Sequence, residues 1–164
     1  MERIKIERQA ENTVEKKEFD VNEGIVKAVE TVENILKHKK YCAVTVTGSS
    51  ADVGKTFVSG RIGQELKSRR ISVASLSETE SPFIPAFGYG EPEKGKVLLF
   101  TAEGIVLDEE DKQIQNENLI KFGLPLSDVV RVFVYRPDKP FHETELECAD
   151  IIIRNELAVN KTRW

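Results

Sequence analysis

The chain has 164 residues, of which 40% are hydrophobic and 32% charged, and its formal net charge is −4. This is the composition of one globular domain, and its acidic balance argues against nucleic acid or an anionic membrane as a partner. No apolar stretch approaches the ~20 residues needed to span a bilayer. The N-terminus is charged and lacks the apolar core of an export signal, so we expect a single cytoplasmic domain over residues 1–164.

Residues 1–40 predict an N-terminal strand and helix that extend the domain. Residues 2–8 alternate apolar and charged side chains, as a half-exposed strand does, and the polar residues 9–19 predict a loop. Residues 20–23, Asp-Val-Asn-Glu, have the pattern of a capping box. Apolar side chains then recur at helical spacing, which predicts an amphipathic helix ending at the basic residues 38–40.

The rest of the chain alternates strands with helices. Apolar runs predict strands over 41–47, 71–76, 97–102, 129–135 and 149–153. Apolar residues at helical spacing predict a helix over 55–69, and the polar segment 108–124 is expected to be partly helical. Small residues, glycine and proline predict loops over 48–54 and 77–96. Strands that are apolar along their length and separated by helices favour a parallel sheet covered on both faces. We therefore predict a three-layer α/β domain with a mainly parallel sheet.

One loop has the composition of a phosphate-binding loop. Residues 46–56 read Val-Thr-Gly-Ser-Ser-Ala-Asp-Val-Gly-Lys-Thr, after a predicted strand and at the start of a predicted helix. Small residues let backbone N–H groups converge on a polyphosphate, and the helix N-terminus directs partial positive charge at the same anion. Lys55 adds a full charge, and the Thr56 hydroxyl can coordinate Mg²⁺. A glycine turn with a surface lysine is the alternative, since the loop has five residues between its glycines.

The motif predicts a P-loop site for a nucleoside triphosphate, ATP or GTP, together with Mg²⁺. Lys55 is expected to contribute to catalysis as well as to binding. Asp52 can hydrogen-bond the backbone amides of the loop or lie beside the transferred phosphoryl group. The residues predicted to contact the nucleotide through this loop are Gly48, Ser49, Ser50, Ala51, Asp52, Val53, Gly54, Lys55, Thr56 and Phe57.

Acidic side chains follow two of the predicted strands. Glu103 comes directly after the strand 97–102, where a metal-associated acid would lie in a parallel sheet. Glu78 and Glu80 follow the strand 71–76. We predict Glu103 as a catalytic and metal-associated residue, with Thr56 and Glu78 also near the metal; solvated loop glutamates are the alternative.

Several other polar residues are candidates for the site. Asn155 follows the last predicted strand, and its amide can donate and accept, as recognition of a base requires; a strand-ending asparagine without that role is the alternative. The candidates for the positive charge that phosphoryl transfer uses are Arg131, Arg136, Lys139 and Arg154. Cys42 and Cys148 are expected to be reduced thiols.

The loop resembles those of the P-loop NTPase superfamily, and most closely that of dethiobiotin synthetase and related ligase-like enzymes. The shared features are the five-residue spacing, the acidic Asp52 and the closing Val-Gly-Lys-Thr of residues 53–56. The resemblance implies an ATP-dependent reaction through a phosphorylated or mixed-anhydride intermediate. The chain departs from that family at residues 77–78, where Ser-Glu replaces a lysine-proline pair, and at residues 105–106, where Ile-Val replaces a glycine-rich stretch.

The order of elements resembles uridine kinase and its relatives. A helix precedes the phosphate loop, residues 97–104 form an apolar run that ends in Glu-Gly, and residues 149–152 resemble a closing strand. Those kinases have long segments for the nucleoside and for an arginine-bearing lid. Here the corresponding segments, 76–97 and 137–149, are short.

These patterns predict a Mg²⁺-dependent phosphotransferase or ligase-like enzyme acting on a small molecule. The short segments leave a second hypothesis, a nucleotide-dependent switch or accessory subunit that regulates a partner protein. A relative that keeps the fold and has lost turnover is the third. The expected partners are a nucleoside triphosphate and either a small-molecule substrate or a protein. A homodimer stays open, and neither nucleic acid nor a membrane is expected.

Overall fold

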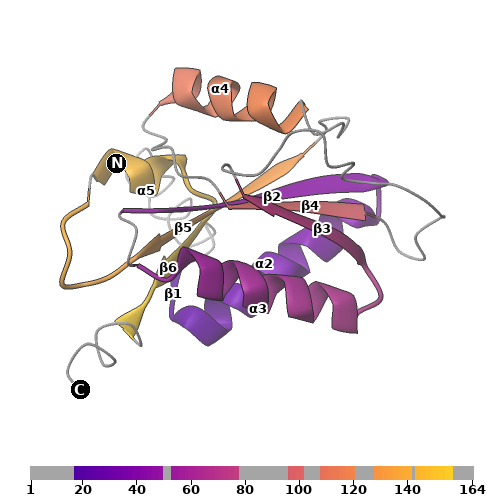
Figure 1. The fold of residues 1–164 in the computed structure, drawn as a ribbon, viewed down its shortest axis with the longest axis horizontal. Coiled ribbons are helices and arrows are strands. Elements are labelled where there is room, and N and C mark those ends of the chain that lie inside the picture. The colour runs from indigo at the N-terminus through magenta and orange to yellow at the C-terminus, as the bar shows by residue number, and fades with distance from the viewer. Residues whose placement is uncertain are drawn as a thin grey trace, which may run out of the picture.

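The computed structural model describes residues 17–49, 53–77, 96–101, 108–120, 128–141 and 143–156. These residues form one six-stranded sheet with helices on both of its faces (Figure 1). Every pair of neighbouring strands within them is parallel. The predicted α/β fold, with a parallel sheet between helical layers, is therefore confirmed.

The elements alternate as the sequence predicts. In chain order they are β1 (Glu18–Phe19), α2 (Val21–Leu36), β2 (Tyr41–Gly48), α3 (Lys55–Ser68), β3 (Ser72–Ser77), β4 (Lys96–Thr101), α4 (Glu109–Ile120), β5 (Val129–Tyr135), α5 (Glu143–Cys148) and β6 (Ile151–Arg154). Strands β2 to β5 agree with the prediction to within one residue at each end, and β6 begins two residues later than expected. The strand predicted over residues 2–8 lies outside the described residues.

Strand β2 lies at the centre of the sheet. The strand order is β1-β6-β5-β2-β4-β3, so β5 and β4 flank β2. Val46 lies beside Thr101 of β4, and Gly48 lies beside Val134 of β5, so these three strands end at the same edge. Helix α3 follows β2 on one face, whereas α4 lies on the other face and leads across β2 to β5 (Figure 1). The chain therefore changes direction along the sheet at β2. Such a change creates a crevice at the carboxyl ends of the central strands, where open parallel sheets bind ligands.

The two faces of β2 differ in polarity. Val44 and Val46 are fully buried in the main hydrophobic core, which α2 and α3 cover. Thr45 and Thr47 alternate with these valines and therefore point to the opposite face, toward α4 and α5. Burial of apolar surface stabilises the fold by roughly 25 cal/mol per Å², so the valines on the α2–α3 side contribute to the stability of β2.

Helix α2 begins where the sequence predicts. The Asp20 carboxylate accepts a 2.8 Å hydrogen bond from the backbone N–H of Glu23, which makes Asp20 the N-cap. Such a cap stabilises a helix by about 1 kcal/mol. The helix ends at Leu36, so the basic residues 38–40 follow it and lie outside its last turn.

The prediction of a loop over residues 9–19 is wrong at its C-terminal end, because Glu18–Phe19 form the strand β1. Strand β1 pairs in parallel with β6 at the edge of the sheet. The Tyr135 hydroxyl donates a 2.8 Å hydrogen bond to the Glu18 carboxylate, and Phe19 packs against the main core. These partners are remote in sequence, so the local pattern of a short polar segment does not reveal the strand.

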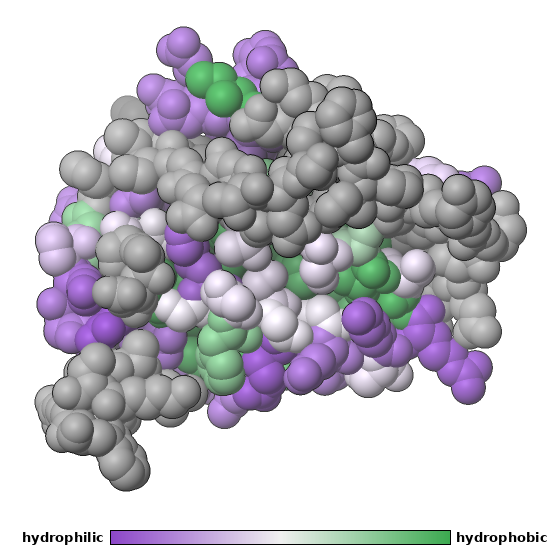
Figure 2. Space-filling view, viewed as in Figure 1, coloured by the Kyte–Doolittle hydropathy of each residue, from purple (hydrophilic) through white to green (hydrophobic). Residues whose placement is uncertain are grey.

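The helices on the second face are short and polar. Helix α4 has three acidic residues in its first turn, where the helix dipole favours them, and its outer surface is mostly hydrophilic (Figure 2). Helix α5 packs on β5 through Leu146. The sequence did not predict this helix, because six residues with one aliphatic side chain are too few to show a helical period. None of the helices in the described residues is long and apolar enough to cross a membrane.

Candidate functional site

The predicted phosphate loop begins at the carboxyl end of β2. Gly48 is the last residue of that strand, and the backbone N–H of Ser49 donates to the carbonyl of Val134 at 3.3 Å. The Ser49 hydroxyl is buried and has no hydrogen-bond partner among the described residues. Buried polar atoms normally have a partner, so this hydroxyl is a candidate ligand contact. The middle of the loop, Ser50, Ala51 and Asp52, lies outside the described residues.

Lys55 folds back across the start of the loop. It is the first residue of α3, yet only 6% of its surface is exposed. A Cβ atom at Gly48 would lie 2.9 Å from Cγ of Lys55 and 2.5 Å from Cγ2 of Val53. Contacts this short do not occur in proteins, so only glycine at position 48 lets the Lys55 stem lie against the end of β2.

Gly54 closes the loop in a left-handed conformation. Its φ angle is 98°, a backbone conformation that residues other than glycine rarely adopt. A Cβ atom here would also lie 2.3 Å from Nδ2 of Asn155, so space requires glycine as well. The Gly54 carbonyl accepts a 3.0 Å hydrogen bond from the N–H of Val58, which starts α3. The first N–H groups of a helix have no acceptor within the helix. Because α3 starts directly after Gly54, these N–H groups lie next to the loop.

Asn155 lies under the loop. Its side-chain amide donates to the carbonyl of Val53 at 2.7 Å, and its backbone N–H donates to the carbonyl of Tyr135 at 2.8 Å. Only 2% of Asn155 is exposed, and Val53 is fully buried. The structure therefore places Asn155 where it positions the loop backbone. The expected contact between Asn155 and a base stays a prediction.

Thr56 and Phe57 follow Lys55 in the first turn of α3. Both are exposed, Phe57 by 40%. The guanidinium carbon of Arg61, one turn along the helix, lies 5.8 Å from the centre of the Phe57 ring, within the range of a cation–π contact. The structure thus brings Thr56 and Phe57 to the surface beside the loop, where a bound ligand could reach them.

The predicted acids lie outside the described residues, but the strand that leads to Glu103 is well defined. Strand β4 ends at Thr101, beside Val46 of β2. The Thr101 hydroxyl donates to the Ser59 hydroxyl at 3.1 Å, which ties α3 to the end of β4. Glu103 follows Thr101 by two residues; Glu103, Glu78 and Glu80 are not among the described residues.

The candidate cations occupy different environments. Arg136 follows β5 at the same edge as the loop, is 5% exposed, and binds Asp138 through two hydrogen bonds of 2.9 and 2.6 Å. This contact holds the pKa of the Asp138 carboxyl below its usual value. Arg154, at the end of β6, is exposed and pairs with Glu156 at 2.8 Å. Arg136 is therefore a buried, paired charge near the loop edge, and Arg154 is a surface charge.

The other two candidate cations are Arg131, within β5, and Lys139, in the turn that follows it. Arg131 lies in the middle of β5, where its Nη2 donates to Oδ1 of Asn116 at 2.7 Å. Burial lowers the pKa of the Arg131 guanidinium from its ordinary value. Lys139 lies in the turn after β5, and its backbone N–H donates to the carbonyl of Arg136 at 3.1 Å. The structure therefore does not bring all four cations together.

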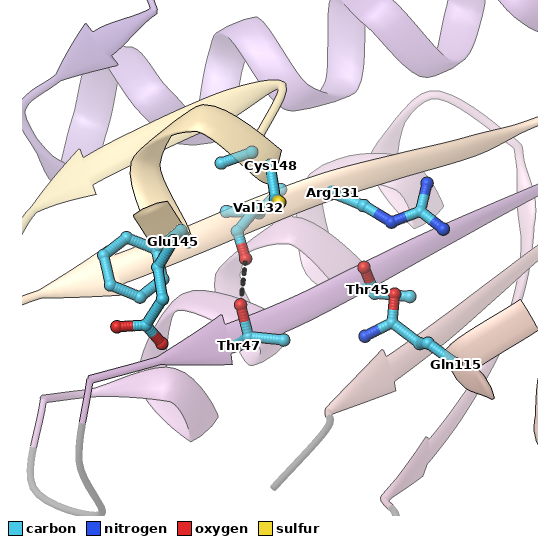
Figure 3. Close-up of a pocket in the computed structure, with 9 residues that line it drawn as sticks. Thr45, Thr47, Gln115, Arg131, Val132, Glu145 and Cys148 are labelled. Atoms are coloured by element: carbon cyan, nitrogen blue, oxygen red, sulfur yellow. Dashed lines mark hydrogen bonds between the residues drawn. The ribbon is translucent and has the colours of Figure 1, made fainter. Parts of the chain in front are cut away.

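Sequence reasoning missed a second group of polar residues, on the face that α4 and α5 cover. Thr45, Thr47, Gln115 and Glu145 are all buried there, and Glu145 is only 3% exposed. Together with Arg131 they line a small pocket (Figure 3). The available signal is the alternation of threonine with apolar residues in β2, which marks one face of a buried strand as polar.

Comparison with known proteins does not identify the chain. A scan against protein-family models finds no match, and a search of curated proteins finds no similar sequence.

Proposed function

We propose that the chain binds a nucleoside triphosphate with Mg²⁺ at residues 48–57 and uses it to phosphorylate or activate a small molecule. The observation that carries the proposal is the arrangement of Gly48, Gly54 and Lys55. The aliphatic stem of Lys55 lies against the end of β2, and Lys55 is the first residue of α3. A full positive charge and a helix N-terminus then meet at the carboxyl end of the central strand, where a polyanion would be stabilised by both.

The position of Lys55 at the N-terminus of α3 supports an anionic ligand on electrostatic grounds. The N-terminus of a helix disfavours a cation, by about 0.3–1 kcal/mol at exposed sites. A phosphate group bound between the ammonium and the helix N-terminus would reverse that penalty, because it attracts both. The exposed fraction of 6% argues against a solvated surface lysine beside a glycine turn.

Each residue of the site would have a separate part in the reaction. The loop backbone and Lys55 would bind phosphate oxygens, the Thr56 hydroxyl would bind Mg²⁺, and Asn155 would hold the loop in place. The bound Mg²⁺–triphosphate would supply the activated phosphoryl group. The chain would contribute positioning and charge stabilisation. Glu103 and Glu78 are proposed as the acids that orient the metal.

The proposal is tested by thermal unfolding of the full chain with ATP, GTP and other triphosphates, each with Mg²⁺. A ligand at 100 times its Kd stabilises the native state by about 2.7 kcal/mol, which raises the melting temperature measurably. Lys55→Ala should abolish this shift. Lys55→Met keeps the stem against Gly48 and removes the charge, so it should weaken affinity roughly 10- to 150-fold, because a hydrogen bond to a charged group contributes about 1.5–3 kcal/mol.

Lys67→Met is the matched control, since Lys67 is exposed in the last turn of the same helix. It should leave triphosphate affinity unchanged. Equal affinity in the parent chain and in both Lys55 variants would overturn the proposal.

A metabolite screen at saturating nucleotide then addresses the substrate. Tight binding without turnover of any metabolite would favour the regulatory switch, which predicts that a protein partner is recovered in only one nucleotide state.

A further inference from the structure

The pocket between the sheet and the helices α4 and α5 combines apolar walls with a few buried polar side chains. Its lining includes Thr45 and Thr47 of β2, Gln115 of α4, Arg131 of β5 and Glu145 of α5 (Figure 3). Thr45 and Thr47 point away from the main core that α3 covers. The pocket is therefore distinct from the site at Lys55.

Three side chains in this lining carry buried polar atoms without a hydrogen-bond partner among the described residues. They are the Thr45 hydroxyl, Oε1 of Gln115 and Nε of Arg131. Thr45 is fully buried and Gln115 is 5% exposed. The three residues come from different elements and lie together at one end of the pocket (Figure 3). An unpaired buried polar group costs about 1–3 kcal/mol, so three of them around one pocket indicate a shared partner.

The size of the pocket limits that partner. Its volume is about 10 Å³, which is room for about one water molecule. Sites for metabolites and cofactors are typically about 300–1,000 Å³. A metabolite is therefore too large by more than an order of magnitude.

The charges around the pocket exclude ions as well. The guanidinium of Arg131 disfavours a bound cation. The buried Glu145 and the carbonyl oxygen of Gln115 disfavour a bound anion. Because Gln115 offers an acceptor, Arg131 a donor and Thr45 both, the partner must be a neutral molecule that donates and accepts hydrogen bonds.

We propose that the pocket binds one structural water molecule that links β2, β5 and α4. The water donates to Oε1 of Gln115, accepts from Nε of Arg131 and shares a hydrogen bond with the Thr45 hydroxyl. Three hydrogen bonds are typical of a buried water. Nη2 of Arg131 already donates to Oδ1 of Asn116 at 2.7 Å and to the carbonyl of Lys112 at 3.5 Å, both in α4, so the water adds a further link between α4 and the central strands.

The direct test is the detection of this water in the full chain. In isotopically labelled protein, NMR cross-relaxation between water and the Thr45 methyl group should reveal a long-lived contact. A crystal structure that resolves ordered water should show one molecule within hydrogen-bond distance of all three side chains. A dry pocket, or direct hydrogen bonds among Thr45, Gln115 and Arg131 in place of the water, would overturn the proposal.

Thr45→Val gives an independent test through the sign of its effect on stability. If water fills the pocket, valine removes one of its hydrogen bonds, and the urea midpoint falls. If the pocket is dry, valine removes an unpaired buried hydroxyl, and the midpoint rises. Thr47→Val on the same face calibrates the measurement, since the Thr47 hydroxyl donates to the carbonyl of Val132 at 3.4 Å and its loss should lower the midpoint in either case.

Discussion

The side-chain amide of Asn155 donates a 2.7 Å hydrogen bond to the backbone carbonyl of Val53, 102 positions earlier in the chain. The bond joins the end of β6 to the last part of the loop before Gly54. Both residues are buried, so the bond is shielded from solvent in the folded chain. The conformation of the loop therefore depends on the final strand of the sheet, which lies two strands away from β2.

Replacing Asn155 should destabilise the fold. Asn155→Ala leaves the buried Val53 carbonyl without its donor, and we expect the free energy of unfolding to fall by about 1–3 kcal/mol. Urea denaturation measures this change. Asn22→Ala in the first turn of α2, at an exposed position, is the control and should change stability by less than about 0.5 kcal/mol. An Asn155 effect no larger than the control would mean that the bond does not stabilise the loop.

Two glycine-to-alanine changes in neighbouring turns should have opposite effects. Gly54→Ala combines an unfavourable φ with a Cβ that meets Asn155 at 2.3 Å, so it should destabilise by more than about 1 kcal/mol. Gly60→Ala in α3 should stabilise by about 0.5–1 kcal/mol, since a Cβ there meets no described atom within 4 Å and alanine favours helix. Urea or thermal unfolding compares the two.

A double variant separates the two causes at Gly54. Gly54→Ala with Asn155→Ala removes the steric contact and keeps the unfavourable φ. The double variant should therefore lose less stability than the sum of the single variants. Additive losses would show that the contact with Asn155 contributes nothing to the requirement for glycine.

Stability should fall at high pH because of Cys42. Burial, with a smaller contribution from Asp128, raises the pKa of the Cys42 thiol from 9.0 to about 12. The unfolded chain then loses this proton more readily than the folded chain, so the free energy of unfolding falls as the pH rises from about 9 to about 12. The slope contributed by one thiol is at most about 1.4 kcal/mol per pH unit.

The test compares pH series of urea unfolding for the parent chain and for Cys42→Ala. The variant should lose part of the alkaline slope, whatever its stability at neutral pH. Cys148→Ala is the control: burial raises the pKa of that thiol too, but its side chain is partly exposed and should contribute less. Parallel pH curves for Cys42→Ala and the parent chain would contradict this account.

Tyr135→Phe should loosen the docking of β1. The change removes the hydrogen bond to the exposed carboxylate of Glu18, and we expect a loss of about 1 kcal/mol or less. The amide proton of Ile152, which donates to the carbonyl of Lys17 at 2.7 Å, should exchange faster with solvent. Hydrogen exchange followed by NMR measures this. Glu18→Gln keeps an acceptor and should have a smaller effect; unchanged exchange at Ile152 in Tyr135→Phe would contradict the assignment.

Much of the candidate site could be predicted from the sequence. The sequence predicts the succession of strand, small-residue loop, lysine and helix over residues 41–69. Each of these parts depends on local composition and on the spacing of apolar residues. Those residues did form β2 and α3, with Gly48 and Gly54 at the ends of the loop. The prediction that this loop binds a triphosphate stays a prediction.

The rest of the site could not be read from local patterns. The strand β1, the helix α5 and the buried role of Asn155 all depend on contacts with distant segments. The same holds for the pocket beside α4 and α5, since Thr45, Gln115 and Arg131 come from three elements. A threonine or an arginine in a sequence gives no indication of which other polar atoms will lie beside it.

The sequence by itself determined the α/β class, the positions of the main strands and helices, and the glycine–lysine loop, because hydrophobic period, capping and glycine content act over a few residues. The tertiary structure alone decided that Asn155 holds Val53, that Lys55 lies buried across Gly48 and that unpaired polar groups gather under α4. These contacts arise where parallel pairing brings the carboxyl ends and faces of strands together, and strand order is set by long-range packing that no local pattern encodes.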